Sequence, residues 1–166
     1  MKKLFILFLL SFSLLACSSD DNGSNNTSGN ILGTWNGVSV DLSGSTNVDF
    51  QGQNFDVNFV GESYDEDFSI LVTENPNVIS STGTYSLELT ATILGLPMSE
   101  NVEDLFLLED SEWSRNGNEL TLTAQGQSQT ATIIELTDNS MTISLEVVQE
   151  IMGNMVTADA IAVFEK

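Results

Sequence analysis

From Ile31 onward, apolar and polar residues alternate with a period of two over several long runs. This alternation is typical of β-strands, because successive side chains point to opposite faces of a sheet. No amphipathic helix of useful length is visible in the same region. The clearest runs are Asn54–Phe59, Tyr85–Ile93, Glu119–Ala124 and Met141–Val147. The sequence therefore predicts an all-β domain whose strands each have one apolar and one polar face.

Turn signals separate these runs. Asn116-Gly117 is a strong signal for a two-residue hairpin, and further turns are expected at Gln125-Gly126, Asp138-Asn139 and Gly153-Asn154. Together they predict an antiparallel meander from about Leu105 to Phe164. In the first half we expect strands at Thr34–Leu42, Val48–Val60, Asp67–Thr73 and Ser80–Leu94.

An up-and-down sheet with this many strands tends to close on itself, because closure removes its exposed edges. We therefore predict an antiparallel up-and-down β-barrel of eight to nine strands. The alternative is an open β-sandwich.

The N-terminus has the layout of a secretory signal peptide, with Lys2 and Lys3 before an apolar stretch that extends to Leu15. The stretch is shorter than the roughly 20 apolar residues of a transmembrane helix. Leu14-Leu15-Ala16-Cys17 resembles the lipobox of bacterial lipoproteins. The resemblance implies cleavage before Cys17 and membrane anchoring by lipid on its sulfur. The alternative is an ordinary secretory peptide that is cleaved after Ala16.

Residues 18–30 contain no aliphatic or aromatic side chain, so we expect residues 17–30 to form a flexible polar tether with a span of roughly 20 Å. Ser18-Ser19-Asp20-Asp21 resembles the acidic export signal of surface lipoproteins in some Gram-negative bacteria. This implies an outer-membrane lipoprotein exposed at the cell surface, with the periplasmic face as the alternative. The expected division is a signal peptide at 1–16, the tether at 17–30 and the domain at 31–166.

The composition excludes several classes of function. The formal net charge is −20 with only four Lys and Arg, which is incompatible with nucleic-acid binding. The chain has no histidine, which removes Ser-His-Asp catalysis and the usual zinc sites. Cys17 is the only cysteine, so no intrachain disulfide is expected. We expect a monomer without enzymatic activity, cofactor or metal, although a carboxylate pair would remain an option for catalysis.

Two acidic clusters lie at residues 62–67 and 100–112. Loop carboxylates of this kind can bind calcium, but neither cluster has the ligand spacing of an EF-hand loop. We interpret both as solvated turns.

The domain resembles the lipocalin-like domains of bacterial surface lipoproteins over about residues 31–166. The resemblance rests on the Gly-x-Trp of Gly33-Thr34-Trp35, on Gly83-Thr84-Tyr85, on the Trp113–Leu120 hairpin and on the final strand, Ala160–Glu165. Lipocalins often stack an Arg from the last strand on the first-strand Trp. The last strand here has no Arg, so the resemblance implies that Trp35 and Arg115 close the barrel, or that its end is closed differently.

If the barrel forms, its interior is the natural site for one small ligand. The candidate lining residues are on the apolar faces of the strands: Phe55, Val57, Phe59, Tyr85, Leu87, Leu89, Leu122, Ile143, Leu145 and Ala160. Ala158, Ala160 and Ala162 would make one face unusually small. The same residues could instead fill a dry core.

Two functions follow from these alternatives. The first is non-enzymatic binding of a small apolar ligand at the cell envelope by a lipid-anchored, lipocalin-like protein. The second is a structural or interaction module with a solid core that binds another envelope protein.

Overall fold

The computed structural model describes residues 26–50, 52–93, 95–151 and 154–166. The expected signal peptide, Cys17 and the tether up to residue 25 lie outside the described residues. Regular structure in the described part consists of β-strands. None of the described segments forms a helix long and apolar enough to cross a membrane.

Nine strands follow one another in the described part of the chain, and every paired strand runs antiparallel to its neighbours. They are β1 (Gly33–Phe50), β2 (Gln53–Thr73), β3 (Val78–Ile93), β4 (Leu96–Leu105), β5 (Ser111–Asn116), β6 (Glu119–Ala124), β7 (Gln127–Leu136), β8 (Ser140–Ile151) and β9 (Asn154–Glu165).

The sheet order is β2-β1-β9-β8-β7-β6-β5-β3-β4, and an additional pairing of β2 with β3 joins eight of the strands in a ring. β4 pairs with β3 alone among the described residues and lies outside this ring. The predicted all-β, antiparallel up-and-down fold is confirmed. The hydrogen-bonded ring is not regular enough to be called a barrel.

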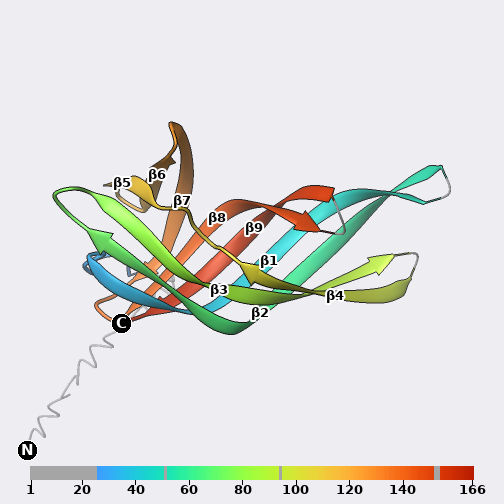
Figure 1. Ribbon diagram of the computed structural model, residues 1–166, viewed down its shortest axis with the longest axis horizontal. Coiled ribbons are helices and arrows are strands. Elements are labelled where there is room, and N and C mark those ends of the chain that lie inside the picture. Colours follow the sequence, from blue (N-terminus) through green and yellow to red (C-terminus); the bar gives the residue numbers. More distant parts are fainter. Residues whose placement is uncertain (1–25, 51, 94, 152–153) are drawn as a thin grey trace, which may run out of the picture.

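The irregularity comes from the short strands. In Figure 1 the hairpins β1–β2, β3–β4 and β8–β9 extend together toward one end, whereas β5, β6 and β7 lie at the other. β4 and β5 both run along the same edge of β3, but only Val78 and Ile79 of β3 pair with β5. The ring is therefore closed at one end and open along much of its length.

The strand boundaries in the first half differ from the prediction in three places. The predicted strand Val48–Val60 is divided between two strands, because β1 ends at Phe50 and β2 begins at Gln53. β1 continues through the polar stretch 43–47, which was expected to be a turn, because that stretch pairs with residues 56–60 of β2. The expected break between Val60 and Asp67 is a β-bulge within one long strand, with Asp65 at a φ of 52°. Polar residues and a positive φ are compatible with both a turn and a bulge.

The core fills the closed part of the ring. Phe68 packs against the rings of Tyr85 and Phe164, with ring centroids 5.5 and 5.7 Å apart respectively. Small residues of β1 and β9 lie in this core. A methyl group on Gly37 would overlap the Phe68 ring, and Ala160 and Ala162 are fully buried. Ala158, Ala160 and Ala162 of β9 thus belong to the same buried core cluster as these rings.

Candidate functional site

A cavity of about 810 Å³ lies where β7 and β8 separate. Residues 131–136 of β7 pair with β8, whereas residues 127–130 pair only with β6 among the described residues. Because β7 turns away at this point, Gln127–Thr130 and Glu146–Val148 form two diverging walls of the cavity. The cavity is thus a direct consequence of the incomplete ring.

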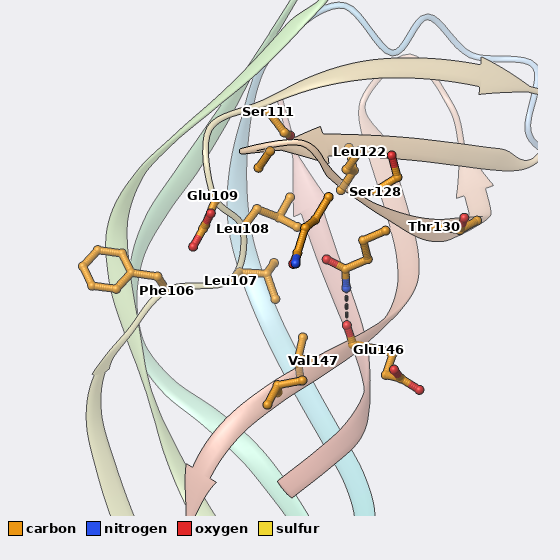
Figure 2. Close-up of a pocket in the computed structure, with 14 residues that line it drawn as sticks. Phe106, Leu107, Leu108, Glu109, Ser111, Leu122, Ser128, Thr130, Glu146 and Val147 are labelled. Carbon is orange, nitrogen blue, oxygen red and sulfur yellow. Dashed lines mark hydrogen bonds between the residues drawn. The ribbon is translucent and has the colours of Figure 1, made fainter. Parts of the chain in front are cut away.

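The linker between β4 and β5 supplies another wall. Leu107 and Leu108 line the cavity and are each 7% exposed, while Phe106 beside them is 67% exposed. Figure 2 shows the Phe106 ring directed away from the two leucines. The backbone N–H of Ser81 donates to the Asp110 carboxylate at 2.8 Å, which ties the end of the linker to β3.

The cavity is lined by both apolar and polar residues. Leu107, Leu108, Leu122 and Val147 are the buried apolar residues that line it. The polar side is formed by Gln127, Ser128, Gln129 and Thr130 on β7, together with Glu109 and Glu146. The Gln129 side-chain amide donates to the backbone oxygen of Glu146 and thereby bridges the two diverging strands (Figure 2).

Ser111 is the buried polar residue of the cavity lining. It begins β5 opposite Ile79 and is 6% exposed, and its Oγ has no hydrogen-bond partner among the described residues. A buried hydroxyl without a partner is unfavourable by about 1–3 kcal/mol. The Ser111 Oγ is therefore an unsatisfied hydrogen-bonding group beside the cavity.

Most of the residues expected to line a ligand site belong instead to the packed core. Leu122 alone of the ten also lines the cavity. Seven others pack in the same core cluster: Phe59, Tyr85, Leu87, Leu89, Ile143, Leu145 and Ala160. Val57 is buried and Phe55 is half-buried on β2.

Sequence reasoning missed the linker leucines, Ser111 and the start of β7. The signal for the linker was present as the apolar run Leu105–Leu108, enclosed by acidic residues on both sides. Its lack of alternation separates it from the neighbouring strands. Ser111 and the β7 residues have no comparable signal, because their role depends on where β7 leaves β8.

The closed end of the ring is built around Trp35. Its side chain is fully buried, and its indole N–H donates to the backbone oxygen of Ile31 at 2.7 Å. The cation that covers the ring is Lys166, at 4.1 Å from the centroid. Arg115 lies elsewhere, and its guanidinium donates to the backbone oxygens of Gly117 and Thr27 at 2.8 and 2.6 Å.

The segment 26–30, at the end of the expected tether, is held against this same end. The backbone N–H of Leu136 donates to Asn26 O at 2.7 Å, and that of Gly29 donates to Leu136 O at 2.9 Å. The Thr27 hydroxyl also donates to the Asn118 side chain at 2.9 Å. This part of the chain therefore has a defined path along the sheet.

A second, shallower cavity of about 470 Å³ lies beside this segment and includes Trp113, Arg115 and Glu74. The Trp113 indole donates to Thr73 O at 2.9 Å, so the ring is fixed by the fold. No group of three or more acidic side chains in the described part is arranged to hold a metal ion.

Tyr85 is the buried ionisable group of the core. Burial raises the pKa of its phenol to about 12, and its hydroxyl has no partner among the described residues. It does not line either cavity.

Comparisons with protein-family models, with curated proteins and with solved structures gave no match to this chain.

Proposed function

We propose that this protein is a lipid-anchored, lipocalin-like protein of the bacterial cell surface that binds a small apolar ligand without transforming it. The observation that carries the binding proposal is the cavity of about 810 Å³ between the β4–β5 linker, β6, β7 and β8. Its volume falls within the range of roughly 300–1,000 Å³ found for small-molecule sites.

The apolar half of the lining offers a surface for an apolar ligand. Leu107, Leu108, Leu122 and Val147 provide buried contact surface, and each methylene transferred onto such a surface contributes about 0.8 kcal/mol. Val148 is 58% exposed and adds apolar surface at the rim of the cavity, whereas the Phe106 ring, 67% exposed, is directed away from the linker leucines (Figure 2). Exposed apolar side chains that surround a cavity are typical of a ligand entrance.

Pyrene offers a direct test of the binding proposal, because it is apolar, uncharged and fluorescent. The full chain carrying Cys17→Ala would be titrated with pyrene, and the emission spectrum would report transfer to an apolar environment. Ala124→Trp adds bulk at the cavity wall, and we expect it to weaken binding at least tenfold. Thr123→Trp, on the neighbouring position of β6 outside the lining, is the matched control and should leave binding within twofold. Equal binding by both variants would exclude this cavity as the site.

The lipid anchor is supported by the signal peptide and by the lipobox-like sequence that ends at Cys17. Two acyl chains are enough to hold a protein stably on a membrane. Cys17→Ala should therefore move the protein from the membrane fraction to the soluble fraction. Retention of the variant on the membrane would contradict the anchor. Protease accessibility on intact cells would separate the outer surface from the periplasmic face.

A second candidate function is a module that binds another envelope protein. It is favoured by the edges of β4 and of β8 beyond Leu145, each of which pairs on only one side in the described part. Leu96 and Met98 on β4 and Val148 on β8 are exposed beside these edges. A photo-crosslinker at Met98 should then capture a protein partner that a crosslinker at the outward-facing Val60 does not. This outcome, together with no binding of pyrene, would favour the second function.

A further inference from the structure

The charged residues that line the cavity are all acidic. Glu109 from the linker and Glu146 from β8 line it from opposite sides, and no Lys or Arg is among its lining residues (Figure 2). Glu109 accepts a weak hydrogen bond of 3.4 Å from Gln125, which leaves its charge uncompensated. An anionic group entering the cavity would therefore meet like charge at its entrance.

The cations of the described part are engaged elsewhere. Arg115 is bonded to the backbone oxygens of Gly117 and Thr27, and Lys166 lies over Trp35. The formal net charge of −20 adds long-range repulsion of anions. A carboxylate or phosphate inside the cavity would lose its hydration without gaining a cationic partner.

The inner polar group of the cavity is neutral. The Ser111 hydroxyl can both donate and accept a hydrogen bond, and it has no protein partner in the described part. A positive charge placed beside it would also be desolvated, because the Glu109 and Glu146 side chains are exposed rather than buried next to Ser111. Only a neutral polar group satisfies the hydroxyl without this desolvation.

We propose that the ligand is an uncharged, mainly apolar molecule that enters with a single hydroxyl or carbonyl group first and forms a hydrogen bond with the Ser111 Oγ. Its apolar body then lies against Leu107, Leu108 and Val147 and extends toward the exposed rim. Fatty-acid-like anions are rejected. This inference rests on the proposed binding function and adds the chemical class of the ligand.

The test is displacement of pyrene by 1-octanol and by octanoate, which share a chain length and differ in charge. The full chain carrying Cys17→Ala should bind octanol at least tenfold more tightly than octanoate. Ser111→Ala should weaken octanol binding about fivefold to tenfold and leave pyrene binding within twofold, because pyrene has no hydrogen-bonding group. Ser114→Ala, on an exposed position of the same strand, is the control and should change neither.

The charge argument has its own matched pair of variants. Glu109→Gln with Glu146→Gln should raise octanoate affinity at least threefold at low salt and leave octanol unchanged. Glu62→Gln with Glu135→Gln removes the same charge from exposed positions outside the cavity and should have a smaller effect. If both pairs of variants gain octanoate affinity equally, Glu109 and Glu146 do not exclude anions from the cavity.

The outcomes separate the two levels of the proposal. Absence of pyrene binding would refute the binding function itself. Normal pyrene binding with equal affinity for octanol and octanoate, or with no effect of Ser111→Ala, would refute only the ligand class. If Ser111→Ala also loses pyrene, Ser111→Thr decides, because it retains the hydroxyl. If the Ser111→Thr variant binds octanol at the original affinity, the role of the hydroxyl is supported. If it does not bind octanol, that role is refuted.

Discussion

The ammonium nitrogen of Lys166 lies 4.1 Å from the centre of the Trp35 ring. The same nitrogen donates to the backbone oxygen of Asn30 at 3.1 Å, and Trp35 donates to Ile31 O. Lys166, which follows β9, thus contacts both the start of β1 and the segment before it. This contact closes one end of the ring.

Replacement of Lys166 by Met should lower the free energy of unfolding by about 0.5–2 kcal/mol, because it removes the cation–π contact and the bond to Asn30. Lys166→Arg preserves a cation and should retain most of the stability. Chemical denaturation at high salt is the suitable measurement, since salt screens the general repulsion in this acidic chain. A Lys166→Met variant as stable as the original protein would show that the contact does not contribute to stability.

Gly37 and Phe68 form a second pair, in which the Phe68 ring leaves no room for a side chain at position 37. A side chain at position 37 would overlap the Phe68 ring, so Gly37→Ala should destabilise the protein by about 1–3 kcal/mol. The measurement is thermal or chemical unfolding.

A double-mutant cycle provides the control for this pair. Phe68→Leu shortens the ring side chain, and Gly37→Ala should then cost less in that background than in the original protein. Strictly additive effects would show that the destabilisation does not come from the overlap with Phe68.

The sequence predicts the fold class well because alternation is a local signal. The runs at Tyr85–Ile93 and Glu119–Ala124 fall within β3 and β6, and Gln125-Gly126 forms the β6–β7 turn. The signals are weaker where polar residues are compatible with two structures. The stretch 43–47 pairs within β1 because residues 56–60 lie beside it, which no local pattern reveals.

The candidate site was less predictable for a related reason. The sequence identifies Leu122 as inward-facing but does not show which inward-facing residues meet a packed neighbour and which meet open space. That distinction depends on the separation of the part of β7 before Ala131 from the part of β8 after Leu145. The contact of Lys166 with Trp35 was not predicted either, because the resemblance to lipocalins implies an arginine beside this ring.

Ala160 tests whether the small face of β9 borders a packed core. Its side chain is fully buried and lines neither of the two cavities described above, so Ala160→Phe should destabilise the protein by about 1–3 kcal/mol. Ile161 is the next residue and is 42% exposed, so Ile161→Phe should change stability by less than about 0.5 kcal/mol. Both would be measured by chemical denaturation. Equal tolerance of the two changes would contradict the packed core.

The buried phenol of Tyr85 should make the stability of the protein depend on pH in the alkaline range. Burial raises the pKa of its phenol from 10.0 to about 12, so the folded protein holds this proton more tightly than the unfolded chain. Its contribution to stability is fully present below pH 10 and is lost as the pH rises toward 12. The loss should amount to about 2–3 kcal/mol.

Tyr85→Phe should remove this part of the alkaline destabilisation. Near neutral pH the variant should stay within about 1 kcal/mol of the original protein, because the hydroxyl has no hydrogen-bond partner in the described part. Tyr64→Phe leaves Tyr85 in place and serves as the control. The measurement is the free energy of unfolding by denaturant at a series of pH values between 8 and about 12. If Tyr85→Phe and Tyr64→Phe lose stability in parallel over that range, the buried phenol is not responsible for the alkaline loss.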